Sequence, residues 1–393
     1  MKQICPTKFC MGCTACMNVC QHSAISMKAD KYGFYYPKID QDICIDCGLC
    51  VATCPVNHPV KITYPSDCYA VLSDDKEEIK KVASGGMASV LSRYVLRKGG
   101  VVYGSCGVDI RNVHHIRIDS MKDLDKLRGS KYVQSYMGNI YSQVKKDLQE
   151  NKMVLFTGTP CQVAGLKAFL HKKEYENLYT VDLICHGVPS QQMLNDNINS
   201  YTKYENNSCR VAFRLKPCAV NQPNVIHSIT FGWFFQSQPC KSDSQIYVPW
   251  YKDAYMLGFI GCLIFRPNCY ECRYACVARC GDFTVGDFWG LAKDAGFNDT
   301  DGVSLVFINS IKASKIWIEN LNICKSVKRS VIEAIKGNGQ LQQPSSKPIT
   351  YERFRELYPL MPFKEAVYAC SKWRLRQVRR EKVKKFIKRV LKK

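Results

Sequence analysis

The spacing of apolar residues after residue 80 predicts a helix followed by a short strand. Five apolar side chains recur at intervals that place them on one helical face: Met87, Val90, Leu91, Tyr94 and Val95. The pair Gly99-Gly100 is typical of a helix C-terminus. The apolar run at residues 101–103 then predicts a strand.

The middle of the chain repeats this rhythm of apolar run, turn and helix. Residues 153–156 and 178–184 are apolar runs, and residues 163–170 between them have helical spacing. Alternating strands and helices predict βαβ units in a partly parallel sheet. Ligands of such sheets bind at the carboxyl ends of the strands. The turns that follow the two apolar runs carry Cys161 and Cys185.

The remaining segments give weaker patterns. A further apolar run at residues 303–308 predicts another strand, whereas residues 205–260 are rich in aromatic residues and give no clear assignment. Residues 1–58 are dense in cysteine and have little periodicity, and a proline-bearing connector spans residues 55–65. The fold class predicted from these patterns is α+β, with a small cysteine-rich domain before a mixed α/β domain.

Composition changes this picture mainly through cysteine. The chain has 393 residues, of which 46% are hydrophobic and 23 are cysteine. It has no run of 18 apolar residues, and its first residues lack the apolar core of a signal peptide. We therefore expect a cytoplasmic protein. In that reducing compartment, so many cysteines are expected to bind metal or carry redox chemistry rather than to form disulfides.

The positive charge is concentrated in a C-terminal tail. The formal net charge is +22, and residues 372–393 contain twelve Lys or Arg residues and one acid, Glu381. The tail predicts a basic amphipathic helix, with apolar residues near one face: Leu375, Val378, Phe386, Ile387, Val390 and Leu391. Such a helix would bind an anionic membrane surface peripherally, at about 1 kcal/mol per basic residue. The alternative is a solvated helix packed by one side. No fold specific for nucleic acid is recognised.

Two cysteine runs share one spacing. They are Cys10-x2-Cys13-x2-Cys16-x3-Cys20 and Cys44-x2-Cys47-x2-Cys50-x3-Cys54. Bacterial ferredoxins with two 4Fe–4S clusters have this spacing, and the fourth cysteine of each run ligates the other cluster. The first cluster is thus predicted to bind Cys10, Cys13, Cys16 and Cys54. The second is predicted to bind Cys44, Cys47, Cys50 and Cys20.

Two features of these runs bear on the iron–sulfur interpretation. Gln21 stands where ferredoxins usually have a proline, but that proline shapes a turn and does not ligate. Zinc sites are the alternative, yet they usually use paired CxxC knuckles with four ligands per metal. Cys5 lies outside the pattern and is expected to be a small buried residue.

Several separated motifs resemble one family. They are the segments TGTPCQ (157–162), GSKYVQS (129–135), CHGVPS (185–190), RPNCYEC (266–272) and GDFWG (286–290). Together they resemble the coenzyme F420 hydrogenase/dehydrogenase beta-subunit family, which also includes a plant reductase of chlorophyll derivatives. The resemblance covers roughly residues 68–310.

The resemblance implies a flavoprotein that binds FAD and carries a third 4Fe–4S cluster. It divides the chain into a ferredoxin-like domain (1–60), two parts of a flavin-binding domain (68–150 and 151–325) and a C-terminal extension (326–393). The implied flavin-binding residues are Ser84, Gly85, Gly86, Lys131, Tyr132, Gln134, Ser135, Thr157, Gly158, Thr159 and Gln162. Without the resemblance, these segments would be read as an ordinary helix N-terminus, a solvated Lys-Tyr pair and a strand end. The chain lacks a G-x-G-x-x-G after a strand, so a Rossmann site is not expected.

The third cluster has two candidate ligand sets. The preferred set combines the CxxC pair Cys269 and Cys272 with Cys161 and Cys185, because adjacent strand ends would converge on that pair. The alternative is a local quartet drawn from residues 262–280, which also contain Cys262, Cys276 and Cys280. These last three cysteines are otherwise read as buried thiols.

The function that follows is electron transfer between ferredoxin-type clusters and a flavin, which reduces or oxidises a small organic substrate. A flavin joins one-electron to two-electron chemistry, and His186 or Asp287 is a candidate general acid. The partners expected are a redox protein (a ferredoxin or a reductase) and a small-molecule substrate. The alternatives are a non-catalytic subunit that delivers electrons to a partner enzyme, and an iron–sulfur scaffold without redox turnover.

Overall fold

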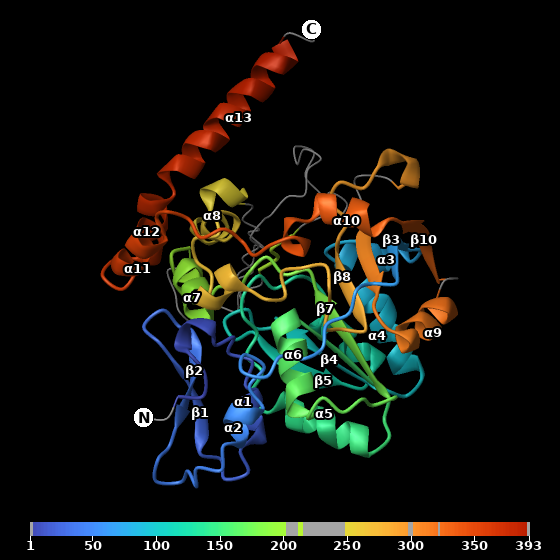
Figure 1. Cartoon of the computed structure of the whole chain (residues 1–393). Helices are drawn as coiled ribbons and strands as arrows, with labels where there is room; N and C mark the ends of the chain where they lie inside the picture. Colours follow the sequence, from blue (N-terminus) through green and yellow to red (C-terminus); the bar gives the residue numbers. More distant parts are fainter. Residues whose placement is uncertain (1–2, 202–210, 215–247, 298–301, 321–322, 391–393) are drawn as a thin grey trace, which may run out of the picture.

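The computed structural model describes residues 3–201, 211–214, 248–297, 302–320 and 323–390, with residues 320 and 382–390 described by their backbone alone. Within this part, a sheet of eight strands forms the centre of the protein, in the order β10-β3-β9-β8-β7-β6-β4-β5 (Figure 1). Its strands are β3 (Asp67–Ser73), β4 (Val101–Cys106), β5 (His114–Ile118), β6 (Val154–Gly158), β7 (Leu178–Leu183), β8 (Phe283–Asp287), β9 (Ser304–Ile308) and β10 (Cys324–Arg329).

The direction of the strands brings several chain segments to one edge of this sheet. Strands β4, β6, β7 and β8 run parallel to one another, so their carboxyl ends meet there. Strand β9 begins at the same place, because Ser304 pairs with Asp287 at the end of β8. Ser304 also pairs with Val71, which brings the end of β3 alongside. We call this side of the sheet the carboxyl edge.

Alternation along the strands gives the sheet two apolar faces. Val154 and Phe156 of β6 pack in a core with Val163 of α6 (Pro160–Phe169) and Tyr141 of α5 (Ile140–Gln149). Leu155, which points to the opposite side, packs in a core with α4 (Met87–Arg97) and α9 (Ile311–Asn320). Both faces of the parallel part are thus covered, as parallel sheets require.

The cysteine-rich N-terminal segment forms a separate small unit. It contains the antiparallel hairpin β1 (Ile25–Ala29) and β2 (Tyr35–Ile39), with α1 (Ala15–Val19), α2 (Leu49–Ala52) and the 3-10 turn η1 (Thr7–Phe9). This unit, drawn in blue, lies beside α6 on the α5/α6 face of the sheet (Figure 1).

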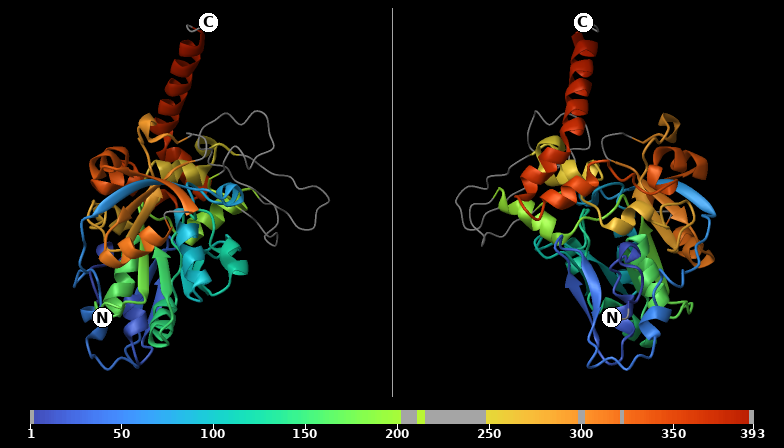
Figure 2. Two further views of the ribbon diagram at one scale, coloured as in Figure 1. Left: turned by 90° about the vertical axis from the view of Figure 1, so that its right-hand side faces the viewer. Right: turned by 60° about the vertical axis from the view of Figure 1, so that its left-hand side comes forward.

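A helical layer joins this unit to the C-terminus. Helices α7 (Gln191–Asn199), α8 (Ala254–Ile260), α11 (Tyr351–Leu357) and α12 (Phe363–Cys370) share one apolar core with Tyr32 and Phe34. Helix α13 (Lys372–Val390) then extends away from the body of the protein in each view (Figure 2). The other short elements are α3 (Lys76–Lys81), α10 (Val331–Gly337), η2 (Met121–Lys126), η4 (Trp250–Lys252), η5 (Pro267–Glu271), η6 (Lys293–Ala295) and η8 (Gly339–Leu341).

The sequence patterns predicted most of these elements. The predicted α+β class agrees with the mixed sheet, and the predicted strands and the helix after residue 86 are present. The helix predicted over residues 163–170 begins earlier, at Pro160, because Thr159 is its N-cap and proline suits the first helical position. Much of the unassigned segment 205–260 lies outside the described residues. Of the apolar residues predicted for the C-terminal helix, Leu391 and the side chains of Phe386, Ile387 and Val390 also lie outside them. Among the described helices, none is both long and apolar enough to cross a membrane.

Candidate iron–sulfur centres

The first predicted cysteine set lines one cavity of the N-terminal unit. The cavity wall includes Cys10, Cys13, Cys16 and Cys54. Gly12 and Thr14 have positive φ values of 64° and 65°, which curl the CxxCxxC loop so that its thiols face one another. Cys54 reaches the same cavity from the far end of the domain, just after α2. The crossed assignment therefore agrees with the spatial arrangement of these thiols.

The second predicted set lines a neighbouring cavity nearer the surface. Cys20, Cys44, Cys47 and Cys50 all contribute to its wall. Gly48, with φ of 75°, turns the chain between Cys47 and Cys50. Cys47 is exposed to solvent. This cavity is therefore the more accessible of the two.

The thiols around the first cavity strongly influence one another. A hydrogen bond from the Cys5 thiol lowers the pKa of Cys10 to about 6 and the pKa of Cys54 to about 7. The Arg266 guanidinium lowers the pKa of Cys10 further. Burial instead raises the pKa values of Cys13 and Cys16. Four thiolates in so small a space need a positive counter-charge, which the core of an iron–sulfur cubane supplies.

Among the described residues, no three His, Cys, Asp or Glu side chains lie close enough to hold a single metal ion. A cubane sits among its four ligands and keeps their sulfur atoms farther apart than one ion does. Proximity around a shared cavity, rather than a tight mononuclear site, is therefore the relevant geometric criterion for these cysteines.

The preferred ligands of the third cluster also come together. Cys161 lies in the first turn of α6, Cys185 follows β7, and Cys269 and Cys272 lie in and just after η5. Burial is the main cause that raises the pKa of Cys185, to about 12, and the thiols of Cys161 and Cys272 raise it further. Burial also raises the pKa of Cys269, with smaller contributions from the other three thiols. The structure thus gathers these four thiols at the carboxyl edge.

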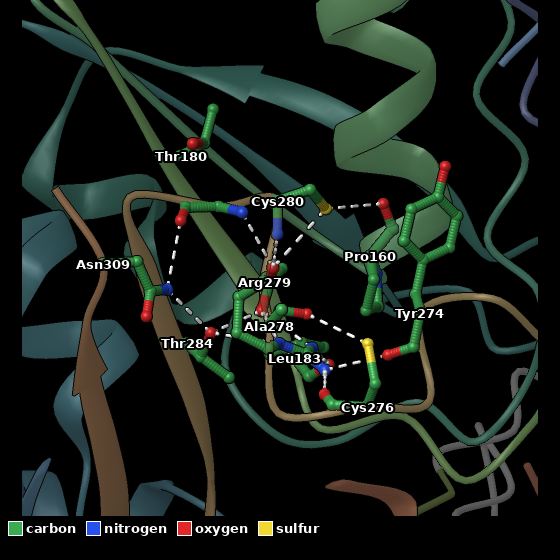
Figure 3. Close-up of polar contacts among 12 residues, drawn as sticks. Pro160, Thr180, Leu183, Tyr274, Cys276, Ala278, Arg279, Cys280, Thr284 and Asn309 are labelled. Atoms are coloured by element: carbon green, nitrogen blue, oxygen red, sulfur yellow. Dashed lines mark hydrogen bonds and ion pairs between the residues drawn. The ribbon is translucent and has the colours of Figure 1, made fainter. Parts of the chain in front are cut away.

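The other three cysteines of the alternative quartet make separate contacts. The Cys280 thiol donates to the Pro160 carbonyl at 3.2 Å, and the Cys276 thiol donates to the Ala278 carbonyl at 3.2 Å (Figure 3). Cys262 lies 3.5 Å from Nε2 of His186. These contacts favour the preferred set over the local quartet, although both remain predictions.

A buried ion pair fixes the loop that follows Cys272 (Figure 3). Arg279 donates to Asp182 of β7 at 2.8 Å, and both side chains are fully buried. Arg279 also donates to the carbonyl oxygens of Leu183, Tyr274 and Cys276. Asp182 in turn accepts backbone N–H groups of Cys280 and Gly281. This network fastens the loop after η5 to β7, three residues before Cys185.

Tyr274 lies in the same loop. Its side chain is 3% exposed, and its hydroxyl has no hydrogen-bond partner among the described residues. Burial raises its pKa most, and the nearby thiols of Cys280, Cys161 and Cys13 raise it further. The hydroxyl therefore lies close to cysteines of two predicted clusters.

Arg266 ties the N-terminal unit to the rest of the protein, and sequence reasoning assigned it no such role. Its guanidinium donates to the carbonyl oxygens of Cys10 and Tyr35, each at 2.8 Å, and to Oε1 of Gln134 at 3.2 Å. It also lies 4.3 Å from the ring centroid of Tyr36. The side chain is completely buried. A single arginine before a proline gives no periodic signal, so the sequence pattern could not reveal this contact.

Helix α6 brings the first and third cysteine sets together. A Cβ atom on Gly165 would lie 2.9 Å from Cβ and 3.1 Å from Sγ of Cys13. Cys161 lies one helical turn before Gly165 and so shares its face. Only glycine permits Cys13 to approach this closely. The first and third sets are therefore neighbours along one face of α6.

Two segments predicted to bind flavin both lie at the carboxyl edge, where the ion pair between Arg128 and Glu78 links them. The loop Ser84–Gly86 precedes α4, and a Cβ atom on Gly85 would lie 2.0 Å from the Val71 carbonyl oxygen, so this glycine is needed for close packing on β3. The Lys131 ammonium donates to the carbonyls of Leu127 and Arg128. Arg128 pairs with Glu78, which packs near Gly86. Burial lowers the pKa of Lys131 to about 8.

The other predicted flavin residues form internal contacts. The Gln162 amide accepts the Thr159 N–H and donates to the Ser135 carbonyl, which holds the TGT turn that includes Gly158. Gln134 donates to the Met11 carbonyl. The Tyr132 ring stacks on Phe259 at a centroid distance of 4.8 Å. The Gln134 side chain therefore connects the N-terminal unit to the rest of the protein, and the Gln162 side chain stabilises the TGT turn.

His115, which sequence reasoning did not select, supports this turn. Its ring nitrogens contact the Ser135 hydroxyl at 2.8 Å and the Thr157 carbonyl at 3.0 Å. Burial lowers the pKa of His115 to about 4. It is therefore a neutral, structural histidine. No pattern in the sequence singles this residue out.

The two candidate general acids occupy different environments. His186 is partly buried, its Nδ1 contacts the Gln340 amide at 2.6 Å, and burial lowers its pKa to about 4. Asp287 at the end of β8 forms an ion pair with Arg214. Both lie at the carboxyl edge, and both are held by neighbouring side chains.

Comparison with known proteins identifies two regions of the chain. Residues 9–58 match the family model of the 4Fe-4S dicluster domain. Residues 151–325 match the family model for the C terminus of the coenzyme F420 hydrogenase/dehydrogenase beta subunit.

Two curated relatives match the ferredoxin region. Ferredoxin 7Fe of Hydrogenibacillus schlegelii is 42% identical over 53 residues, 13% of this chain and 62% of the relative. Ferredoxin-type protein NapF of Escherichia coli strain K12 is 36% identical over 45 residues, 12% of this chain and 27% of the relative. The chain thus spans less than two thirds of either relative.

One solved structure also aligns with the chain. It belongs to the F420-reducing [NiFe] hydrogenase complex from Methanosarcina barkeri, with a TM-score of 0.47 and 17% identity, covering 75% of this chain and 93% of that chain. The two family matches thus identify a chain in which a 4Fe-4S dicluster domain precedes a region, residues 151–325, that is similar to the C terminus of the coenzyme F420 hydrogenase/dehydrogenase beta subunit.

Proposed function

We propose that this protein is an iron–sulfur flavoenzyme that carries electrons between its ferredoxin unit and a small organic substrate. The observation that carries the proposal is the contact across α6, where Cys13 of the first set lies against Gly165, one turn from Cys161 of the third. Because the second cavity is the accessible one, electrons enter or leave the ferredoxin unit there. The three cysteine sets then form one continuous series from the surface to the carboxyl edge.

FAD would bind at the carboxyl edge and would there couple single electrons to a two-electron reaction of the substrate. Lys131 supports this proposal. Its ammonium is held by two backbone carbonyls and makes no ion pair with a carboxylate among the described residues, so it is suited to an anionic group such as the FAD pyrophosphate. The N-terminus of α4 at Gly86 offers backbone N–H groups that could also bind an anionic phosphate group.

His186 and Asp287 stay candidates for the acid that protonates the substrate. Asp287 forms an ion pair with Arg214, so its carboxyl group is already engaged by a neighbouring side chain. His186 is neutral near pH 7, because burial lowers its pKa to about 4. A neutral imidazole does not readily give up its own proton, so His186 would act by accepting a proton from solvent and passing it to the substrate, with its ring held in position by Gln340.

Metal and flavin analysis of anaerobically purified protein tests this proposal. We expect about twelve irons per chain, four for each of three cubanes, together with one FAD. Cys161→Ser should lose about four irons, whereas Cys276→Ser, from the alternative ligand set, should retain twelve. The absence of flavin would refute the flavoenzyme, and loss of iron in Cys276→Ser alone would refute the preferred third set.

A second candidate function is a subunit that delivers electrons to a partner enzyme. The surface around the second cavity favours this candidate, because exposed Ile45 and Leu49 line that cavity together with exposed Cys47. Exposed apolar side chains around a redox centre suit a protein partner. Reoxidation of the reduced protein by a protein acceptor, with no reaction towards small acceptors, would favour the subunit over the enzyme.

Peripheral membrane contact through α13 belongs to the same proposal. The helix extends away from the body and carries much of the positive charge of the chain (Figure 2). Co-sedimentation with anionic vesicles should therefore fall with rising salt and should be lost on removal of residues 380–393. Equal binding to neutral vesicles would contradict an electrostatic contact.

A further inference from the structure

Tyr274 presents a polar group that the fold itself does not use. The side chain is 3% exposed, and its hydroxyl lacks a partner among the described residues. Buried tyrosine hydroxyls normally find a hydrogen-bond partner. Leaving such a donor unpaired is unfavourable, so a ligand that accepts its proton would account for the arrangement.

The surroundings of the ring limit what this acceptor can be. Tyr274 packs in one core with Cys13 and Cys280, and Cys161 and Cys272 pack against the same core. The Cys280 thiol is engaged with the Pro160 carbonyl. Figure 3 shows the Tyr274 ring beside Pro160 at the start of α6, with its hydroxyl directed away from Arg279.

The Tyr274 backbone is also fixed. Its carbonyl accepts a hydrogen bond from Arg279 at 3.0 Å, and Arg279 is held by Asp182. The ring is thus positioned by the buried network of the loop. A held donor among sulfur ligands is the arrangement by which proteins tune iron–sulfur clusters.

We propose that the Tyr274 hydroxyl donates a hydrogen bond to a sulfur of the third cluster at Cys161, and thereby raises the reduction potential of that cluster. The inference rests on the proposed function, because it needs the third cluster. A hydrogen bond to sulfur stabilises the reduced, more negative cluster more than the oxidised one. The Tyr274 hydroxyl would therefore favour the arrival of electrons at the carboxyl edge.

Tyr141 provides a matched control. Its side chain is buried in the same core, but its hydroxyl donates to the Gln162 carbonyl at 2.7 Å. Replacement of Tyr141 by Phe removes a hydroxyl from the same region without removing a donor to sulfur. Each of the two Tyr→Phe variants removes one hydroxyl group from a buried ring in the same core.

The test is a potentiometric titration of the full-length anaerobic protein, followed by electron paramagnetic resonance. In Tyr274→Phe, we expect the potential of the third cluster to fall by about 59 mV, which is a tenfold change for a one-electron couple. Tyr141→Phe should leave that potential unchanged. An exchangeable proton coupled to the reduced third cluster should also disappear in Tyr274→Phe. The third signal is identified by its loss in Cys161→Ser.

The outcomes separate this inference from the proposed function. Twelve irons with an unchanged third potential in Tyr274→Phe would overturn the inference alone. Equal shifts in both variants, or a shift confined to the first cluster, would also overturn it. About eight irons in the unaltered protein would remove the third cluster, and then the inference falls with the proposed function.

Discussion

Replacement of Arg279 by Met should both destabilise the protein and empty the third cluster. Arg279 and Asp182 are fully buried and 2.8 Å apart. The substitution removes the cation and leaves the Asp182 carboxylate with two backbone N–H groups, the Thr284 hydroxyl and the Cys280 thiol as donors. It also leaves the carbonyls of Tyr274 and Cys276 without this donor.

The size of the effect follows from this burial. Removal of one partner from a buried ion pair typically costs about 3–5 kcal/mol. At about 2 °C per kcal/mol for a large chain, Tm should fall by roughly 6–10 °C. Because the ion pair holds the loop after Cys272 against β7, we also expect loss of about four irons per chain.

Differential scanning calorimetry and iron analysis measure these two effects. Arg329→Met is the control, because Arg329 also pairs with acidic side chains, at Glu333 and Asp294, but lies on the outer strand β10. The Arg329 and Glu333 side chains are partly exposed and Asp294 is exposed. Such surface pairs contribute about 0–1 kcal/mol, so this variant should keep its Tm within about 2 °C and its full iron content. An Arg279→Met protein with unchanged Tm and about twelve irons would refute the role given to the buried pair.

Gly165→Ala places a Cβ atom 2.6 Å from the Tyr141 hydroxyl oxygen and 2.9 Å from Cβ of Cys13, so it should cost about 1–3 kcal/mol in urea unfolding; an unchanged midpoint would contradict the close contact. Lys131 has its pKa lowered from 10.5 to about 8 by burial, so the unfolded chain binds the extra proton between these values and stability should rise with pH from 8 to 10.5, relative to Lys131→Met. Equal pH profiles would contradict burial of the ammonium, and undiminished FAD binding by Lys131→Met would contradict its phosphate role. His115 has its pKa lowered from 6.5 to about 4, so stability relative to His115→Gln should fall as pH drops from 6.5 to 4; parallel profiles would show that the imidazole is not buried neutral.

The cysteine sets show what local sequence can predict. The ferredoxin spacing assigned Cys54 to the first cavity and Cys20 to the second, and both thiols line those cavities. Spacing sufficed because three ligands of each set lie within seven residues. Cys161 and Cys185 were predicted to converge because parallel strands place their carboxyl ends together.

The residues that hold these sets in place were harder to predict. Arg279 and Asp182 are separated by 97 residues, and their pairing depends on the register of β7 and β8. Asp182 did give a signal, since a charged residue within the apolar strand LYTVDL needs a buried partner. Arg266 gave none, because its partners are mostly backbone carbonyls, which any sequence supplies. Much of the segment 205–260 gave no pattern, and most of it lies outside the described residues.

In the proposed function, electrons pass from the ferredoxin unit along α6 to a third cluster. Electron paramagnetic resonance of the fully reduced anaerobic protein can detect this path, because neighbouring paramagnetic clusters broaden and split each other's signals. We predict such coupling in the unaltered protein and its partial loss in Cys161→Ser, with the signals of the two ferredoxin clusters retained. Identical spectra from the two proteins would contradict a third cluster beside Cys13.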